Sequence, residues 1–482
     1  MTVLVLDIGS SSIRALLFDD RARLIEGAIA TETQQFQTEP TGAATLDVLA
    51  VQTRVERCID RILEHPAARA IRAVSVDTLV GNVLGISEES APRTPVYTYA
   101  DTRSAPDVEQ LRARVDAEKK HQDTGCLLHT AYLPARLHWL RRVASEVFVA
   151  VDRWIDLGTY LYHQWFGPVP VSYSVASWNG LLNRSTLTWD SEWLEILGIS
   201  ERNLPPLADY APCSYVLNDL YARRWPALRD VPWCLPVGDG AAANVGSGCV
   251  SPARVALTVG TTAALRIMTD APLPPVPPGL WSYRVDREHH LIGGATSEGG
   301  NIFHWLTSTL RLPPNAELEQ MLQSLEPDSH GLTFLPLLAG ERSPGWATDA
   351  TGIIGGLRLS TSPVEIAQAA LEGVAHRLAL IFEQLAGLCD DGVELVASGG
   401  ALAASPAWAQ MIANALNRPL LLTSEPELTA RGSAILALRA LGLADLDDFP
   451  PTIARVVQPQ AEAARKMAEA RARQQALYAV WV

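Results

Sequence analysis

The stretch LVLDIGSSSIRALLFDD, residues 4–20, decides the fold. Its first apolar run carries one carboxylate, Asp7, breaks at Gly9 into three serines, and resumes as a second apolar run. Such runs predict two β-strands joined by a glycine turn. Glycine lets the backbone approach an anion closely, and the N–H groups and hydroxyls that follow it can point at phosphate oxygens. The stretch alone is consistent with a plain hairpin and with a hairpin that cradles phosphate.

A near copy of this stretch follows about half a chain later, in VALTVGTTAALRIMTD at residues 255–270. Leu6-Asp7-Ile8-Gly9 aligns with Leu257-Thr258-Val259-Gly260, and the serines that follow align with Thr261-Thr262-Ala263. Each copy has the pattern strand, glycine, hydroxyls, strand. The repetition indicates either two homologous lobes or a chance similarity of two short hairpins. In the first case, the two loops can grip one polyphosphate from both sides.

Length and composition limit the class of protein. With 482 residues, 48% of them hydrophobic, the chain is long enough for two domains facing a cleft. A formal charge of −14 argues against nucleic acid or an anionic membrane as a partner, because phosphate groups select clustered Lys and Arg. No apolar run approaches the roughly 20 residues that span a bilayer, and a strand pattern begins at once, which leaves no room for a signal peptide. We expect a cytoplasmic protein.

The six cysteines show no CxxC pair, so we expect neither a zinc site nor a disulfide framework. We interpret them as reduced, partly buried thiols. They are Cys58, Cys126, Cys213, Cys234, Cys249 and Cys389.

Strand and helix patterns alternate along the chain, which is typical of an α/β or mixed α+β fold. A helix is expected over about 46–65, and two strands are expected in AIRAVSVDTLVGNVLGI at 70–86. Helical sequence with tryptophans covers about 130–165. The proline-rich APLPPVPPG at 271–279 indicates a stiff connection, and 461–479 indicates a terminal helix.

Two further segments combine glycine with residues that can carry chemistry. In LPVGDGAAANVGSG at 235–248, Asp239 lies between glycines and is either a general base toward a hydroxyl or an ordinary turn or N-cap residue. In VELVASGGALAASPAWAQMIANAL at 393–416, Gly399-Gly400 either lets a nucleotide lie against the backbone or permits tight strand-to-helix packing. Asp7 itself needs a partner in its apolar strand, either Mg²⁺ on phosphates or turn N–H groups.

Taken together, these motifs resemble the FGGY carbohydrate kinases, which share a fold with actin, hexokinase and the Hsp70 ATPase domain. LDIGSSSIRALLFD is similar to the family's first phosphate motif, VGDGAAANVGSG to its catalytic-aspartate motif, VALTVGTTAALRI to its second phosphate motif and ASGGALAASPAWAQMIANAL to its adenosine motif. The resemblance implies an α/β fold of two ribonuclease-H-like (actin-like ATPase) lobes with an interdomain cleft. It divides the chain into residues 1–246, with the sugar site and first phosphate motif, and residues 247–482, with the second phosphate and adenosine motifs.

The resemblance further implies an ATP-dependent kinase that phosphorylates a primary hydroxyl of a small sugar or sugar acid, with Mg²⁺ as cofactor. Four stretches are most similar to gluconate kinases of the family: TPVYTYADTRSA, TGCLLHTAYLPARLHWL, WSYRVDREHHLIGGATSEGGNIFHWL and LPLLAGERSPGW. The expected reaction is gluconate to 6-phosphogluconate. The alternatives are a pentulose kinase acting on xylulose or ribulose, an actin-like or Hsp70-like ATPase switch, and a family member that only binds sugar. A homodimer is an open alternative to a monomer.

The resemblance also implies a set of site residues. Asp239 is the expected general base and Asp7 the expected Mg²⁺ anchor. Contacts to the nucleotide and its phosphates are expected from Asp7, Gly9, Ser10, Ser11, Ser12, Arg14, Gly260, Thr261, Thr262, Gly300, His304, Gly399, Gly400 and Ala404. Contacts to the sugar are expected from Thr78, Asp101, Arg103, Arg136 and Asp239.

A sugar acid would also need a cation for its carboxylate. Arg103, Arg136 and Arg342 are candidates, because a guanidinium fork can bind a carboxylate bidentately. Each is alternatively an ordinary ion-pair partner.

The sequence departs from the family pattern around the sugar. Where relatives carry a polar group or histidine after the third strand, this chain has Asp77-Thr78-Leu79-Val80-Gly81-Asn82. The family's Trp-x-Asp-x-Arg becomes Tyr99-Ala100-Asp101-Thr102-Arg103, a lysine near the sugar becomes Arg136, and a glutamine after the catalytic aspartate becomes Gly240. These changes leave the predicted phosphoryl-transfer residues in place and put the identity of the sugar in question.

Overall fold

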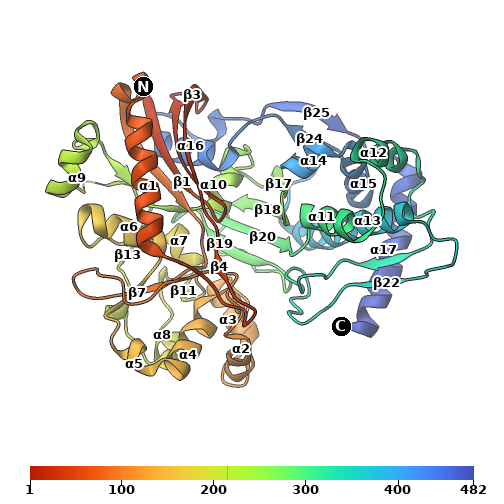
Figure 1. Cartoon of the computed structure of the whole chain (residues 1–482), viewed down its shortest axis with the longest axis horizontal. Helices are drawn as coiled ribbons and strands as arrows, with labels where there is room; N and C mark the ends of the chain where they lie inside the picture. The colour runs from red at the N-terminus through yellow and green to blue at the C-terminus, as the bar shows by residue number, and fades with distance from the viewer. Residues whose placement is uncertain (214) are drawn as a thin grey trace.

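The computed structural model describes residues 1–213 and 215–482 and contains two large mixed sheets of seven strands each (Figure 1). The first sheet has the strand order β14-β15-β6-β1-β2-β3, with β16 also paired to β6. Its strands are β1 (Thr2–Ile8), β2 (Ser12–Asp19), β3 (Leu24–Thr33), β6 (Ile71–Thr78), β14 (Pro212–Cys213), β15 (Trp233–Cys234) and β16 (Val237–Gly238).

The second sheet has the order β19-β20-β18-β17-β23-β24-β25. Its strands are β17 (Arg254–Val259), β18 (Ala263–Thr269), β19 (Trp281–Arg284), β20 (His290–Thr296), β23 (Glu394–Ser398), β24 (Leu420–Thr423) and β25 (Ile453–Val457). Short strands form the smaller sheets: β4 (Gln37–Thr38), β5 (Ala44–Leu46), β7 (Leu84–Ile86), β8 (Val96–Tyr97), β9 (Arg153–Ile155), β10 (Val171–Ser172), β11 (Leu182–Asn183), β12 (Thr188–Trp189), β13 (Leu207–Ala208), β21 (Thr333–Leu335) and β22 (Ile353–Gly355).

The two large sheets repeat one arrangement. β1 pairs antiparallel with β2 and parallel with β6, while β17 pairs antiparallel with β18 and parallel with β23. A third antiparallel strand follows in each sheet, β3 beside β2 and β20 beside β18. The similarity of the two sequence hairpins is therefore the mark of two equivalent lobes, and the predicted two-lobed α/β fold is confirmed.

Helices cover both sheets. In the first half of the chain they are α1 (Val48–Leu63), α2 (Ala105–Arg112), α3 (Ala117–Thr124), α4 (Leu133–Val143), α5 (Ser145–Val149), α6 (Leu157–Phe166), α7 (Tyr173–Ser177), α8 (Ser191–Leu197), α9 (Asp219–Arg224) and α10 (Asp239–Gly246). In the second half they are α11 (Gly300–Thr309), α12 (Asn315–Ser324), α13 (Pro363–Leu385), α14 (Gly400–Ala404), α15 (Pro406–Leu416), α16 (Leu428–Ala440) and α17 (Ala461–Trp481).

Helix α1 shows how the sequence builds one lobe. Its buried residues recur at helical spacing, from Val48 through Val51 and Val55 to Ile59, and they pack in the same apolar core as the strands of the first sheet. Asp47 caps the helix by accepting hydrogen bonds from two backbone N–H groups of the first turn. The second lobe has a separate core, in which α13 is buried on nearly all sides.

Helix α16 lies at the junction of the two lobes. It follows β24 in the second half of the chain, yet it packs on β1, β6 and α10 of the first half (Figure 1). The crossing is close because both helices present glycine: a Cβ on Gly432 would lie 1.8 Å from the Ala242 carbonyl oxygen. The division of the chain at residues 246 and 247 stays a prediction.

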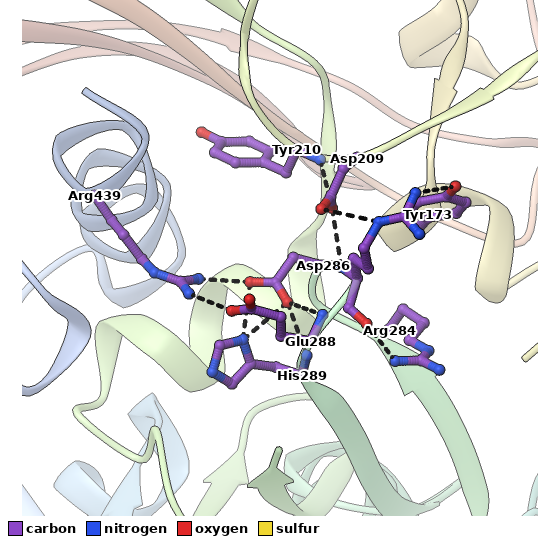
Figure 2. A network of polar contacts seen from close by, with 9 residues as sticks. Tyr173, Asp209, Tyr210, Arg284, Asp286, Glu288, His289 and Arg439 are labelled. Carbon is purple, nitrogen blue, oxygen red and sulfur yellow. Dashed lines mark hydrogen bonds and ion pairs between the residues drawn. The ribbon is translucent and has the colours of Figure 1, made fainter. Parts of the chain in front are cut away.

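A polar network fastens the turn between β19 and β20 to the first half of the chain (Figure 2). Arg287 of this turn donates from its backbone N–H to Asp209 and from its guanidinium to the Tyr173 hydroxyl, each at 2.9 Å. Asp286 accepts hydrogen bonds from His289 and from Arg439 of α16. Burial opposes ionisation of Asp286, but these partners outweigh it and lower the pKa of this carboxyl to about 2.

Most elements expected from the sequence are confirmed. The helix over 46–65 is α1, the strands in 70–86 are β6 and β7, and the terminal helix is α17. The continuous helical stretch over 130–165 is wrong, because strand β9 interrupts it and pairs with β7, with Trp154 buried. Cys58, Cys126, Cys249 and Cys389 are free thiols, and the side chain of Cys213 lies outside the described part. Within the described residues, none of the helices is long and apolar enough to cross a bilayer.

Candidate active site

Both glycine turns have the predicted hairpin geometry. The Gly9 N–H donates to the Ser12 carbonyl at 2.9 Å, and the Gly260 N–H donates to the Thr262 carbonyl at the same distance. The residues at the tips of the turns are partly or fully exposed. Backbone N–H groups and hydroxyls are therefore presented at the end of one hairpin in each lobe, as a phosphate-binding loop requires.

Different neighbours brace the two turns. Gln34, just beyond β3, donates from its side chain to the Gly9 carbonyl at 2.7 Å and from its backbone to the Ser11 carbonyl at 3.0 Å. The second turn is braced by the start of α11, where the Gly300 N–H donates to the Gly260 carbonyl at 2.6 Å. The start of α11 thus lies directly against the second phosphate turn.

Asp7 has a partner that the sequence interpretation did not anticipate. Arg14, opposite Asp7 on β2, forms ion pairs with both Asp7 and Glu427. The second oxygen of Asp7, Oδ1, faces the turn, because it would lie 3.8 Å from a Cβ added at Gly9. The charge of Arg14 is thus shared between two carboxylates, and its role as a phosphate contact stays a prediction.

Asp77, beside Asp7 on β6, is a second buried carboxyl in this row. Its Oδ2 accepts a hydrogen bond of 2.7 Å from Ser433 of α16, and its Oδ1 has no partner in the described part of the chain. Burial and the adjacent charge of Asp7 raise the pKa of Asp77 well above its usual range. Both causes favour the protonated form of Asp77.

A cavity of about 640 Å³ joins the second phosphate turn to α11 and α14. Its lining includes an apolar floor of leucines and Trp408, which suits a flat nucleobase. The predicted nucleotide residues that line it are Gly260, Thr261, Gly300, His304, Gly400 and Ala404. A second cavity of about 840 Å³ shares Gly400 with the first and reaches Arg14, Thr258 and Gly399. Ser10, Ser11, Ser12 and Thr262 line neither cavity and lie on the two turns.

The two adjacent glycines after β23 serve different purposes. Gly399 has a φ of 111°, and a Cβ there would lie 2.2 Å from the Val259 carbonyl oxygen, so this position must be glycine for the strand to pass. No heavy atom lies within 4 Å of a Cβ added at Gly400, which faces both cavities. Tight packing therefore explains Gly399, and room for a ligand explains Gly400.

Asp239 is the first residue of α10, directly after β16. Its Oδ1 accepts the Gly240 N–H at 2.7 Å, and its Oδ2 has no hydrogen bond among the described residues. Burial raises the pKa of Asp239 to about 6, while the Gly240 N–H and the positive charge of Arg266 oppose the rise. Thr78, a predicted sugar contact, pairs in register with Gly238 and so lies next to the proposed base.

Trp178 and Tyr283 form an aromatic wall beside Asp239. Trp178 stacks on Tyr283 with ring centroids 3.7 Å apart and planes 23° apart. A Cβ on Gly240 would lie 2.7 Å from the Trp178 ring, so the indole fills the space that the family's glutamine would need. The indole N–H of Trp178 is buried and has no partner in the described residues, which leaves it available to a ligand.

Two of the three arginines predicted to hold a substrate carboxylate already have partners. Arg103 binds Asp101 through two side-chain hydrogen bonds of 3.0 and 2.6 Å and lies over Trp139. Arg136 is buried and donates to the Gly81 and Thr130 carbonyl oxygens. Neither has the free guanidinium fork that bidentate binding of a carboxylate requires. The contacts of Arg103, Arg136 and Asp101 are those of residues that stabilise the fold, and their role as sugar contacts stays a prediction.

The third arginine, Arg342, is in a different situation. It is half-buried and forms no ion pair in the described part of the chain. Its charge contributes to the low pKa of His129, about 4, for which burial is the larger cause. It also acts electrostatically on Tyr132 of the first lobe and on Tyr283 of the second. Arg342 therefore lies where the lobes meet, close to the aromatic wall.

Three residues of this region escaped the sequence interpretation: Asp77, Trp178 and Arg266. A signal was available for Arg266, since it is the only charged residue between positions 255 and 269. No comparable signal marks Trp178, because its role depends on its position over Gly240 in the folded chain.

A cluster of ligand-type side chains outside this region, Asp328, His330 and Glu372, is explained without a metal. His330 accepts the Leu332 N–H on Nδ1 at 2.9 Å, so in the neutral ring Nε2 carries the proton and donates it to Glu372. A metal on Nε2 would need the opposite tautomer.

Comparison with known proteins decides the class of this site. Residues 2–246 match the N-terminal domain of the FGGY family of carbohydrate kinases, and residues 255–441 match its C-terminal domain. The chain belongs to the FGGY family of carbohydrate kinases. It is therefore an ATP-dependent carbohydrate kinase whose substrates are ATP and a sugar. The ATPase-switch and sugar-binding-only alternatives are set aside.

Both gluconate kinases and a xylulose kinase are among the proteins to which the chain is similar. The chain is 27% identical to the gluconokinase of Bacillus subtilis (strain 168) over 467 residues, which are 92% of this chain and 89% of that one. Its fold matches that of a gluconate kinase from Lactobacillus acidophilus with a TM-score of 0.92 at 26% identity, covering 100% of this chain and 98% of the other. A xylulose kinase from the same organism matches with the same TM-score and identity, covering 99% and 98%.

Proposed function

We propose that this carbohydrate kinase transfers the γ-phosphoryl group of ATP to the primary hydroxyl of gluconate and forms 6-phosphogluconate. The observation that supports this proposal is Arg342, a cation without an ion-pair partner in the described residues. It lies at the lobe junction and acts electrostatically on Tyr283 of the aromatic wall and on Arg266. A chain with a formal charge of −14 repels anions at long range, so an anionic sugar must be neutralised locally. The similarity to gluconate kinases in sequence and fold agrees with this assignment.

Asp239 is the proposed general base. Its free Oδ2 accepts the proton of the substrate hydroxyl as the oxygen forms a bond to the γ-phosphorus, and the bond from that phosphorus to the bridging oxygen of ADP breaks. With a pKa of about 6, the carboxylate is mostly ionised at neutral pH and still basic enough to accept a proton. Trp178 would lie against the sugar and offer its free indole N–H to a hydroxyl.

Mg²⁺ is the proposed cofactor, and the donors on the first hairpin suit it. Mg²⁺ prefers hard oxygen ligands and usually keeps several waters. Oδ1 of Asp7 faces the first turn, while Oδ2 is held by Arg14, so one carboxylate oxygen can bind a hydrated ion. When bound, the ion would neutralise charge on the phosphates of ATP. The hydroxyls of Ser10, Ser11, Thr261 and Thr262 would bind phosphate oxygens from the two turns.

A pentulose kinase is the second candidate. The observation in its favour is the xylulose kinase structure, which matches this chain as well as the gluconate kinase structure does. Against it, a ketopentose is neutral and gives Arg342 no counter-charge.

A substrate panel separates the two functions. Turnover of gluconate, xylulose and ribulose is measured by ADP release for wild type and for Arg342→Met. We expect gluconate to be preferred and the variant to raise its KM by roughly 10- to 150-fold, since a hydrogen bond to a charged group contributes about 1.5–3 kcal/mol. Arg254→Met, which removes an exposed ion pair with Glu394, is the matched control. Preference for a pentulose, with no effect of Arg342→Met, would contradict the proposal.

Compartment and oligomeric state stay predictions. We expect a cytoplasmic enzyme with small-molecule substrates and without a nucleic-acid partner, because its acidic charge repels phosphate backbones. The homodimer is tested by light scattering at several protein concentrations.

A further inference from the structure

Arg266 is the cation of the second hairpin, and it lies between the proposed base and the second phosphate turn. Its Nε would be 3.7 Å from a Cβ added at Gly240, the residue after Asp239. Its Nη1 donates to the hydroxyl of Thr258 at 3.4 Å, two residues before the glycine of the turn. The guanidinium therefore reaches from the base toward the phosphate loop.

The charge of Arg266 is not neutralised by any ion pair among the described residues. The side chain is half-buried, and its Nε is buried without a hydrogen-bond partner. Burial lowers the pKa of Arg266, and Asp239 is the main charge that opposes this effect. A partly desolvated cation without a counter-ion is costly to fold, so its retention indicates an anion that binds beside it.

The position of that anion follows from the neighbours of Arg266. In phosphoryl transfer, the group in flight lies between the attacking oxygen and the leaving oxygen, and its charge is spread over three equatorial oxygens. Asp239 marks the attacking oxygen, and the Gly260 turn marks the phosphate chain of ATP. A guanidinium between these two points faces the equatorial oxygens rather than the far end of the sugar.

We propose that Arg266 is a catalytic residue that binds the phosphoryl group during its transfer from ATP to the sugar hydroxyl. The proposal rests on the proposed function only in using Asp239 as the base. The guanidinium donates N–H groups to oxygens of the transferring group while the bond to the sugar oxygen forms and the bond to ADP breaks. Its fixed charge compensates the negative charge at that point, without reorganisation of solvent.

The test compares Arg266→Met, Arg266→Lys and wild type on the best sugar of the panel and on a second sugar of different charge. We expect Arg266→Met to lower kcat by about 10²–10³ on both sugars, with KM values within a few-fold of wild type, as for loss of one preorganised donor. The kcat of Arg266→Lys should lie between those of wild type and Arg266→Met, because lysine keeps the positive charge but lacks the planar guanidinium fork. Free guanidinium chloride at low concentration should restore part of the kcat of Arg266→Met.

The pH profile tests separately whether the charge of Arg266 acts on the base. Removing the positive charge beside Asp239 should raise the pKa of this base, so the acidic limb of kcat/KM for Arg266→Met should shift to higher pH. Arg266→Lys should keep the limb near its wild-type position. Arg254→Met, on the same sheet and ion-paired with Glu394, should change neither kcat nor the profile.

Three outcomes overturn the inference. An unchanged kcat in Arg266→Met contradicts the proposal, because loss of a group that binds the transferring phosphoryl group must lower kcat. A rise in KM for an acidic sugar alone identifies Arg266 as a contact to the sugar carboxylate. If thermal melting shows that Arg266→Met does not fold, a folded Arg266→Lys variant with wild-type kcat contradicts the proposal instead. Because any accepted sugar serves, failure of the gluconate assignment leaves this test intact.

Discussion

The two glycine hairpins have the same topology but differ in the charges beside their turns. In the first lobe, the register across the sheet places Arg14, Asp7 and Asp77 in one row. In the second lobe, the matching row holds Thr258 and Ser398, whose hydroxyls lie 3.4 Å apart. Two carboxyl groups in one lobe correspond to two hydroxyls in the other.

The arginines of the two hairpins differ in their ion pairs, because the residues that face them differ. Arg14 lies directly opposite Asp7, so its charge is neutralised within the lobe and by Glu427. Arg266 lies opposite Ala256, two pairs further from its turn than Arg14 is from its own, and its partner within the hairpin is the hydroxyl of Thr258 rather than an acid. Both lobes thus have the glycine turn, while the cation of the first hairpin is held by two carboxylates and that of the second has no ion pair among the described residues.

The largest expected effect concerns Asp239, the proposed base. Asp239→Asn removes the only proposed base, so kcat should fall by about 10²–10⁴. Wild-type kcat/KM should decline as the pH falls through about 6, where Asp239 takes up a proton. Steady-state ADP release over a range of pH measures both effects.

Stability provides the control for this variant. The pKa of Asp239 is raised on folding, so its charge weakens the fold above pH 6, and this penalty disappears below the pKa of the unfolded chain. Asp239→Asn should therefore melt at or above the wild-type temperature at neutral pH. A variant that melts lower and retains wild-type kcat would show that this carboxylate is a structural cap.

The second prediction imposes the charge pattern of the first hairpin on the second. Thr258→Asp places a carboxylate beside Arg266, which should pair with it as Asp7 pairs with Arg14. We expect kcat to fall by roughly 10- to 100-fold, because the donor is withdrawn from the transferring phosphoryl group. The control is Thr258→Asn, because asparagine has the shape of aspartate without its charge. The kcat of this variant should fall much less than that of Thr258→Asp. Equal losses in both variants would mean that the hydroxyl, and not the free cation, matters at this position.

The sequence predicted the parts of this site that are local. The hairpins, the glycine turns and the position of Asp239 at the start of a helix follow from patterns of a few residues each. The Arg14–Asp7 pair lies within one hairpin, but Glu427, Asp77 and the approach of Arg266 to Gly240 come from distant segments, which neighbouring residues do not encode. The substitution at Gly240 makes sense only once Trp178 is seen to fill the space above it.

The smallest expected effect tests the second carboxyl of the first hairpin's row. If Asp77 is protonated, Asp77→Asn replaces one neutral group by another of the same shape, and the amide oxygen can still accept the Ser433 hydroxyl. We expect the free energy of unfolding to change by no more than about 1 kcal/mol and kcat to stay near wild type. Ser433→Ala, which removes the hydroxyl, should destabilise more, since it leaves both oxygens of a buried carboxyl unpaired. Urea unfolding and steady-state kinetics measure these changes. A large loss of activity in Asp77→Asn alone would instead show that Asp77 works as an ionised carboxylate, and that the row of the first hairpin carries two active acids where the matching row of the second carries two hydroxyls.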